Sequence, residues 1–265
     1  MILDRAAWFV RYASGWDWWR WSALLAICCL LLPLLWRIGA IWASDQPPHW
    51  RLARWDSAGL APDPAASPEP IIQFYAARTW GWRGIFGVHS WVVFKPRGAA
   101  RYFRYEVVGW GVDAGAPAVR ESTRAPDGYW AGNPPVLLAE KRGDDVDRLI
   151  ERLREAIRSY PFPAEYRLWP GPNSNTFTAY LARALPEMHV DLPPTAIGKD
   201  YLPPGEFAAR APTGSGFQLS LLGLLGITIG PREGIELNLL GLVVGLDFLH
   251  PALKLPFVGR IGVAA

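Results

Sequence analysis

The sequence has little cysteine and little net charge. Its only two cysteines, Cys28 and Cys29, are adjacent within an apolar run. Neighbours on a helix point in different directions, so these two are poor partners for a disulfide within the chain. No cysteine remains in the polar body to ligate zinc or to serve as a thiol nucleophile. The net charge of +3, from 27 basic and 24 acidic residues, forms no basic stripe, so we expect no nucleic-acid partner.

Motifs for metals, nucleotides and structural repeats are missing as well. The histidines other than His89 lack metal-ligand spacing, and Asp144, Asp145 and Asp147 are typical of a helix start. The segment 214–216 is glycine-rich but is not followed by the lysine of a phosphate loop. We therefore predict no metal site and no cofactor.

Tryptophan, by contrast, is abundant and unevenly placed. The chain of 265 residues holds 15 tryptophans, and nine of them lie in the first 55 residues (Trp8, Trp16, Trp18, Trp19, Trp21, Trp36, Trp42, Trp50 and Trp55). They flank an apolar run over 22–43, in which Pro33 is tolerable and Arg37 can extend toward the interface. Because indoles favour the headgroup boundary, we predict a transmembrane helix over 22–43 after a Trp-rich juxtamembrane segment, 1–21. A buried core helix and a cleaved signal peptide are the alternatives.

The orientation of this helix follows from the flanking arginines. Three precede the span and two closely follow it (Arg5, Arg11 and Arg20; Arg51 and Arg54). The positive-inside rule therefore favours a cytoplasmic N-terminus by one charge. The body is then expected outside the cytoplasmic membrane.

The remaining chain divides by composition. Proline is dense over 44–70, which predicts an extended linker. Residues 71–205 combine predicted strands over 71–75, 88–95 and 101–110 with helices that begin near Asp144 and within a residue or two of Ser174. We predict an α+β fold in which helices pack on one side of an antiparallel sheet. The apolar, glycine-rich tail, 206–265, is interpreted as a long β-hairpin that packs on the body or lies against the bilayer; a second membrane element is less favoured.

Ser174 and His89 are the residues that could carry chemistry. Ser174 is placed at a predicted helix N-terminus, where free amides and the helix dipole stabilise negative charge. His89 lies on a predicted strand beside aromatic residues that could fix its ring. The alternatives are ordinary: a serine at a helix start is commonly an N-cap, and a histidine on a strand is commonly structural.

The order of these residues resembles a known group of enzymes. A strand with His89 and Trp91, followed much later by Asn173-Ser174-Asn175-Thr176-Phe177 at a helix start, is similar to the circularly permuted papain-like hydrolases. That group includes permuted NlpC/P60 peptidases and lecithin:retinol acyltransferase-like proteins. The resemblance implies an NlpC/P60-like fold with His89 as the base and Ser174 as the nucleophile, where the group has cysteine. Trp91, Trp169, Asn173 and Asn175 are then expected to contribute to binding.

The whole chain also resembles a bacterial family, domain-of-unknown-function family 3750. The resemblance rests on residues 86–91, on Gly128-Tyr129-Trp130 and on residues 169–177, and the glycine-rich tail fits it too. It names no reaction. Because the family is bacterial, the predicted span places the chain as a single-pass protein of the bacterial cytoplasmic (inner) membrane, and the arginine count places the body on the periplasmic side.

A serine nucleophile needs a well-aligned base, and His89 would need an acceptor to orient it. Glu106 on the next strand is the candidate, with Tyr105 as the alternative. Pairing Lys95 with Arg101 would put Val107 opposite His89 and Glu106 on the other face, but a slip of one residue or a bulge would reverse this.

Two functions remain open from the sequence. The first is a membrane-anchored hydrolase or acyltransferase acting on acyl-lipid, lipoprotein or peptidoglycan-peptide substrates, with membrane lipid as a partner. The second is an inactive papain-like binding or scaffold protein of the envelope. The sequence does not specify the oligomeric state.

Overall fold

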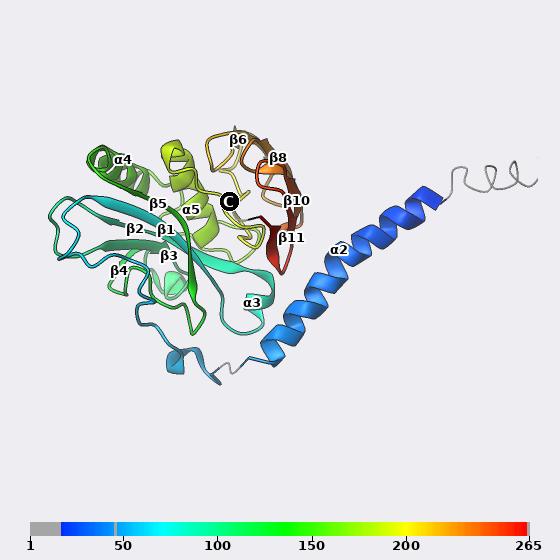
Figure 1. The fold of residues 1–265 in the computed structure, drawn as a ribbon, viewed down its shortest axis with the longest axis horizontal. Coiled ribbons are helices and arrows are strands. Elements are labelled where there is room, and N and C mark those ends of the chain that lie inside the picture. Colours follow the sequence, from blue (N-terminus) through cyan, green and yellow to red (C-terminus); the bar gives the residue numbers. More distant parts are fainter. Residues whose placement is uncertain (1–16, 45–46, 264–265) are drawn as a thin grey trace, which may run out of the picture.

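The computed structural model describes residues 17–44 and 47–263. It comprises a long N-terminal helix and a body built from two antiparallel sheets with packed helices (Figure 1). The predicted α+β class and the N-terminal apolar helix are thus confirmed. Most of the predicted juxtamembrane segment, including Trp8 and Trp16, lies outside the described residues.

Helix α2 (Asp17–Trp42) is the N-terminal element. It begins five residues before the predicted start at Ser22, so Trp18, Trp19 and Trp21 lie on the helix rather than ahead of it. The stretch Trp18–Trp42 is long and apolar enough to cross a membrane, because about 20 apolar residues span the hydrocarbon core.

The first sheet has five strands in the order β4-β3-β2-β1-β5, and every neighbouring pair is antiparallel. The strands are β1 (Ile71–Arg78), β2 (Val88–Lys95), β3 (Phe103–Val107), β4 (Val119–Ser122) and β5 (Pro135–Arg142). The short helix α3 (Arg83–Phe86) links β1 to β2, and the 3-10 turn η2 (Val112–Ala114) lies between β3 and β4.

Two helices cover one face of this sheet, α4 (Val146–Arg158) and α5 (Ser174–Ala184), and the 3-10 turn η3 (Pro186–Met188) follows α5. The main core forms here, because β1 and β2 direct Ile72, Phe74, Val92 and Phe94 toward the helices. Burial of such side chains contributes roughly 1.5–3 kcal/mol each relative to exposure.

The opposite face of the sheet is covered by loops and by the predicted linker. Trp55 packs there against a second core cluster that includes Trp91 and Trp130. The buried Asp127 carboxylate accepts hydrogen bonds from Ser57 and from two backbone amides of the linker. The region 44–70 therefore does more than connect: it contains the 3-10 turn η1 (Trp50–Leu52) and forms one wall of the body.

The register of β2 and β3 differs from the predicted pairing of Lys95 with Arg101. The structure pairs Val92 with Tyr105 and Phe94 with Phe103, a shift of one residue. Because side chains alternate along a strand, the shift moves Glu106 to the sheet face that carries His89.

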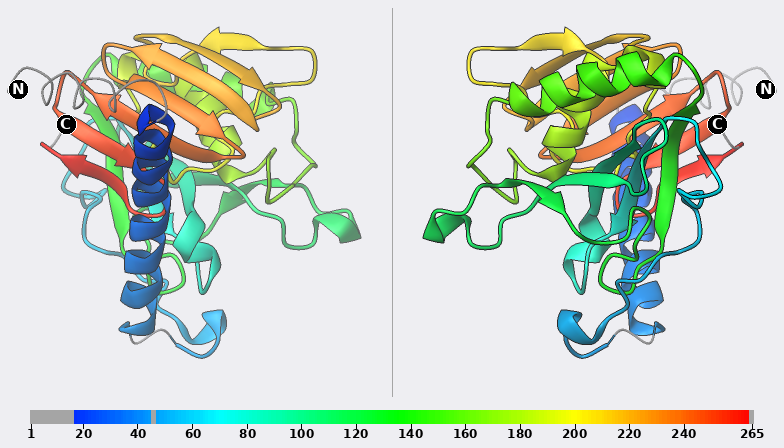
Figure 2. Two further views of the ribbon diagram at one scale, coloured as in Figure 1. Left: turned by 90° about the vertical axis from the view of Figure 1, so that its right-hand side faces the viewer. Right: turned by 90° about the vertical axis from the view of Figure 1, so that its left-hand side faces the viewer.

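The tail forms a second sheet of seven strands, not the single long hairpin predicted. Its strands run in simple sequence order, β12-β11-β10-β9-β8-β7-β6, so it is an up-and-down antiparallel meander. They are β6 (Ala208–Arg210), β7 (Phe217–Leu221), β8 (Leu225–Gly230), β9 (Gly234–Leu239), β10 (Leu242–Asp247), β11 (Ala252–Leu255) and β12 (Gly259–Gly262). Figure 2 shows this C-terminal sheet, in yellow to red, packed beside α5 with α2 running past it.

Buried charged groups join the C-terminal sheet to the rest of the body. Glu236 on β9 binds Lys199 at 2.5 Å and Lys254 on β11 at 2.8 Å. Lys254 also binds Asp191 at 2.9 Å. These side chains satisfy one another where they leave water, as buried ions require, so the inner face of the C-terminal sheet is polar.

Candidate functional site

A cavity of about 980 Å³ opens between the two sheets, α3 and the linker. His89 and Ser174, the two residues that the sequence indicated, both line it. Most of the lining is apolar or aromatic, and seven tryptophans contribute: Trp50, Trp55, Trp80, Trp82, Trp110, Trp130 and Trp169. Such a lining, with a few polar groups, is typical of a small-molecule site.

His89 is held at the start of β2 by Glu106. Its Nε2 lies 2.8 Å from Glu106 Oε2, and both side chains are almost fully buried. The Glu106 carboxylate also accepts from Arg104 at 3.1 Å and from Arg124 at 3.3 Å. Glu106 is thus the orienting acceptor that the shifted register makes available.

These charges fix the protonation of the pair. Burial alone would raise the pKa of Glu106, but Arg104, then His89 and Arg124, outweigh burial and hold that pKa well below its ordinary range. Burial lowers the pKa of His89, against the raising effect of Glu106. Since an ionised carboxylate only accepts, His89 Nε2 carries the proton and donates a hydrogen bond to Glu106. A neutral imidazole then has its lone pair on Nδ1, as a general base requires.

Aromatic rings hold the imidazole plane. His89 stacks on Trp130 with ring centroids 3.6 Å apart, and it lies over Trp91 at 5.8 Å. The column continues outward through Trp110 and Trp50, at successive spacings of 5.7 and 5.5 Å. The stack orients His89, and a protonated ring would gain from the adjacent π faces.

Ser174 is the first residue of α5. The side chain of Asn173 caps the helix by accepting from the amides of Asn175 and Thr176, and Thr176 Oγ1 accepts from the Asn173 amide to complete a capping box. Within the described chain the Ser174 amide has no hydrogen-bond partner, so it is free to donate to negative charge at the helix N-terminus.

Replacing Asn173 with alanine is expected to lower the free energy of unfolding by about 1–2 kcal/mol, because the cap of α5 is lost. The Asn173 amide group also donates to the carbonyls of Leu168 and Ile197. Urea unfolding of the detergent-solubilised chain measures the loss. Asn173→Ser, which retains a cap acceptor and, like alanine, lacks the two donated bonds, should lose less, and an equal loss in both variants would contradict a capping role.

Ser174 and His89 share the cavity but are not hydrogen-bonded to each other. Within the described chain the His89 side chain forms one hydrogen bond, to Glu106, and none joins it to Ser174 Oγ. The neighbouring Ser90 explains the geometry: its hydroxyl contacts Asn175 and Thr178 of α5, at 2.8 and 2.9 Å. Since neighbours on a strand face opposite ways, the His89 ring turns to the other face of the sheet.

The four predicted binding residues have different surroundings. Trp169 lines the cavity, is 51% exposed and donates to the Leu240 carbonyl. Asn173 and Asn175 also line it, but their amide groups are used internally, those of Asn175 by Val88, Ser90 and Ile197. Trp91 is fully buried behind His89 and donates to the Pro126 carbonyl, so it supports the ring rather than the ligand.

Several residues at the site escaped the sequence analysis. Arg104 and Arg124 neutralise Glu106, and Trp130 supplies the stacking face for His89. A signal for Arg104 was available, because residues two apart on a strand share a face, which places Arg104 beside Glu106. Nothing local in the sequence indicates that Trp130 meets His89.

The His89–Glu106 pair predicts a pH dependence of stability. With a folded pKa below 6.5, His89 stays neutral in the folded chain while the unfolded chain takes up a proton. The free energy of unfolding therefore falls as the pH drops from about 6.5 toward the folded pKa. The Glu106 contribution, present above its unfolded pKa of 4.5, is lost only at lower pH. Urea unfolding at several pH values between about 5 and 7 measures this. The free energy of unfolding should change less with pH for His89→Gln than for the wild type; the same change in both would contradict this assignment.

Comparison with known proteins gives one match. A family described as "Protein of unknown function (DUF3750)" matches residues 69–201, about half of the chain. The matched region contains the five-stranded sheet, α4, α5, His89, Glu106 and Ser174, and it ends before the C-terminal sheet. No curated protein and no solved structure matches the chain significantly.

Proposed function

The chain belongs to the DUF3750 family, and from the geometry of its cavity we propose that it is a membrane-anchored hydrolase or acyltransferase of the bacterial envelope. Ser174 is the proposed nucleophile and His89 the proposed base, with Glu106 as its orienting partner. We further propose a papain-like relationship to the permuted NlpC/P60 and lecithin:retinol acyltransferase-like proteins. In its support, a helix that begins with Asn173 and Ser174 packs across the strand that carries His89.

One observation carries the proposal: a buried carboxylate holds a neutral histidine in the wall of a cavity that also contains a serine at a helix N-terminus. A buried ionised Glu106 with two arginines is costly to assemble. At the site, the ionised Glu106 carboxylate fixes the His89 imidazole in the tautomer that leaves Nδ1 basic. In apo structures the catalytic hydrogen bonds are often long and tighten when the substrate binds.

The proposed reaction uses the hydroxyl and backbone amide of Ser174 and the imidazole of His89. Ser174 Oγ attacks a carbonyl carbon while its proton moves to His89 Nδ1, and the carbonyl π electrons move to the oxygen. The free Ser174 amide, at the α5 N-terminus, stabilises this oxyanion. The intermediate collapses as the imidazolium gives its proton to the departing alcohol or amine. Water in hydrolysis, or an acceptor hydroxyl or amine in transfer, then attacks the acyl carbon while His89 Nδ1 takes its proton. The bond to Ser174 Oγ breaks, the serine regains that proton from the imidazolium, and the acid or the acylated acceptor leaves.

The cavity lining favours an acyl substrate over a peptidoglycan peptide. Of the residues that line it, only Arg83, His49 and His89 can carry charge, and none is acidic. The lining also includes Leu240 and Leu242 of the C-terminal sheet and Phe86 of α3. Helix α3 contacts α2, and Arg37 of α2 donates to the Gly84 carbonyl at 3.2 Å. An acyl-lipid or lipoprotein could thus reach the cavity from the membrane that α2 would occupy.

The proposed location is the cytoplasmic (inner) membrane, with the body on the periplasmic side. The support is α2 itself and the arginine balance across it. Two of the arginines in that balance, Arg5 and Arg11, lie outside the described residues.

A second candidate is an inactive envelope protein that binds the same class of ligand. It is favoured by the missing hydrogen bond between Ser174 and His89 and by the turn of His89 toward the opposite face of the sheet. In this case the cavity holds an acyl group without cleaving it.

Comparing the lipids and muropeptides of two strains separates the candidates. One strain lacks the gene, and the other carries Ser174→Ala. If the chain is an enzyme, both strains should accumulate the same uncleaved acylated species. A change in the deletion strain alone, with a normal profile for Ser174→Ala, would support the binding protein and overturn the catalytic proposal.

A further inference from the structure

The C-terminal sheet carries its apolar side chains on the outside. Its register aligns one residue from each of six strands in a continuous outer row: Phe217, Ile229, Ile235, Leu246, Leu253 and Ile261. The residues next to this row on the same strands face inward and are polar: Gln218, Thr228, Glu236 and Lys254 are all buried. An antiparallel sheet with one face in water shows the reverse pattern.

No outward position of the four central strands is polar. In β7, β8, β9 and β10 every second residue points outward, and these twelve residues are all Phe, Leu, Ile or Val. Phe217 is 76% exposed, and Leu237, near the middle of the face, is 57% exposed. Monomeric soluble proteins rarely expose so large an apolar surface, so the face needs a cover.

Helix α2 indicates what covers it. Helix α2 contacts β11 near the edge of the sheet and crosses in front of the sheet in the left view of Figure 2, while Figure 1 shows it running away from the body toward its N-terminus. Helix α2 is least exposed over 28–41, where Pro33 is buried and Leu30, Leu34, Arg37 and Ile41 are among the half-buried residues. At 1.5 Å per residue, the distance from Trp42 back to Leu30 is about 18 Å along the helix. If α2 crosses a hydrocarbon core of about 30 Å, the parts of the body beside Leu30 lie below the membrane surface.

We propose that the outer face of the C-terminal sheet, defined by the outward residues of β7–β12, lies in the lipid hydrocarbon of the leaflet that the C-terminal half of α2 crosses. The membrane thus replaces water on this face, and the apolar residues need no protein partner. This inference holds whether or not Ser174 is a nucleophile.

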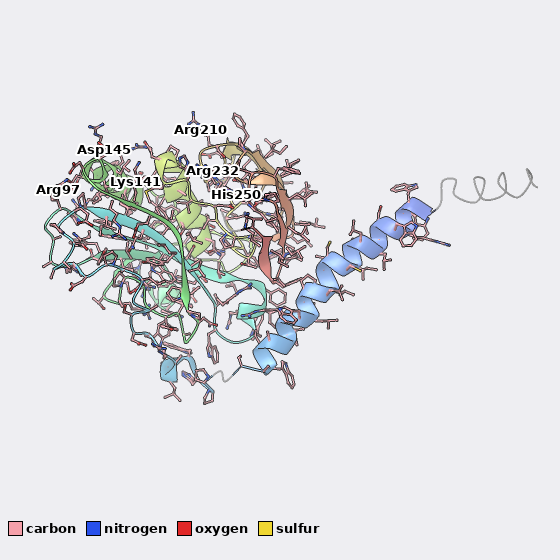
Figure 3. All side chains as sticks on the ribbon, in the orientation of Figure 1. Arg97, Lys141, Asp145, Arg210, Arg232 and His250 are labelled. Atoms are coloured by element: carbon pink, nitrogen blue, oxygen red, sulfur yellow. The ribbon has the colours of Figure 1, made fainter. Side chains whose placement is uncertain are left out.

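Spin labelling of the full chain in vesicles tests the inference. Cys28 and Cys29 are replaced by serine, and a nitroxide is attached to Leu237→Cys or, separately, to Leu219→Cys, which lies in the same outer layer through Ile227. The matched control is Asp145→Cys, an exposed position on the far side of the body (Figure 3). Each chain is reconstituted in phosphatidylethanolamine and phosphatidylglycerol vesicles, and collision with oxygen is compared with collision with a water-soluble nickel complex.

We expect both outer-face labels to collide preferentially with oxygen, with a ratio of oxygen to nickel accessibility at least several-fold above that of Asp145→Cys. Outer-face labels as accessible to nickel as the control would overturn the inference. Labels shielded from both reagents, with dipolar broadening between chains, would also overturn it, because a second copy would then cover the face.

Discussion

Replacing His89 with alanine is expected to slow fluorophosphonate labelling of Ser174 by roughly 100- to 10,000-fold, the usual contribution of a positioned general base. A serine hydroxyl is a weak nucleophile until a base takes its proton. His89 is the titratable group in the cavity that a buried carboxylate orients. The measurement is the labelling rate of the detergent-solubilised chain at neutral pH, followed by gel fluorescence.

His250→Ala is the matched control for this effect. His250 lies in the turn between β10 and β11 of the C-terminal sheet (Figure 3), where its backbone amide donates to Asp247 and its carbonyl accepts from Arg260. We expect His250→Ala to label at the wild-type rate. Equal rates for wild type and His89→Ala would remove His89 from the chemistry and leave it a structural residue of the aromatic stack.

Replacing Glu106 with glutamine is expected to lower the free energy of unfolding by roughly 3–5 kcal/mol, the effect of removing one partner from a buried ion pair. The Arg104 guanidinium is 1% exposed, and among the described residues Glu106 is its ion-pair partner. Glutamine has nearly the same size, so packing changes little. Urea unfolding of the detergent-solubilised chain, followed by tryptophan fluorescence, measures the loss.

Glu121→Gln provides the control, because it removes a carboxylate of the same sheet near the surface. Glu121 binds Arg101 at 3.3 Å and Tyr105 at 2.9 Å, where solvent screens the charge. We expect a loss of less than about 1 kcal/mol for this variant. If Glu106→Gln were as mild as Glu121→Gln, the buried charge cluster would not organise the site as described.

Local signals in the sequence located the main elements of the site. The capping residues ahead of Phe177 predicted the start of α5 correctly, because a cap is set by side chains within a few residues of one another. The strand over 88–95 was likewise predicted with its observed bounds, since aromatic and β-branched residues cluster there. Both features depend on neighbours along the chain.

The features that the sequence left open depend on pairing between distant segments. Whether Glu106 meets His89 is decided by a register shift of one residue, and short strands of similar composition do not specify it. The meeting of Trp130 with His89 depends on a loop more than 35 positions away in the chain. The C-terminal sheet was predicted as a hairpin because one turn, over 230–234, separates two apolar stretches. Apolar and polar residues alternate along its strands, but this alternation shows which face of the sheet is apolar only once the seven strands are aligned.

Mapping the fluorophosphonate adduct on the full chain tests directly whether Ser174 is the nucleophile. The wild-type chain is labelled in membranes, digested and analysed by mass spectrometry, in parallel with Ser174→Ala and with Ser90→Ala as a buried-serine control. We expect a single adduct on Ser174 that persists in Ser90→Ala and vanishes in Ser174→Ala. An unlabelled wild-type chain, or a label that survives Ser174→Ala, would contradict this role for Ser174.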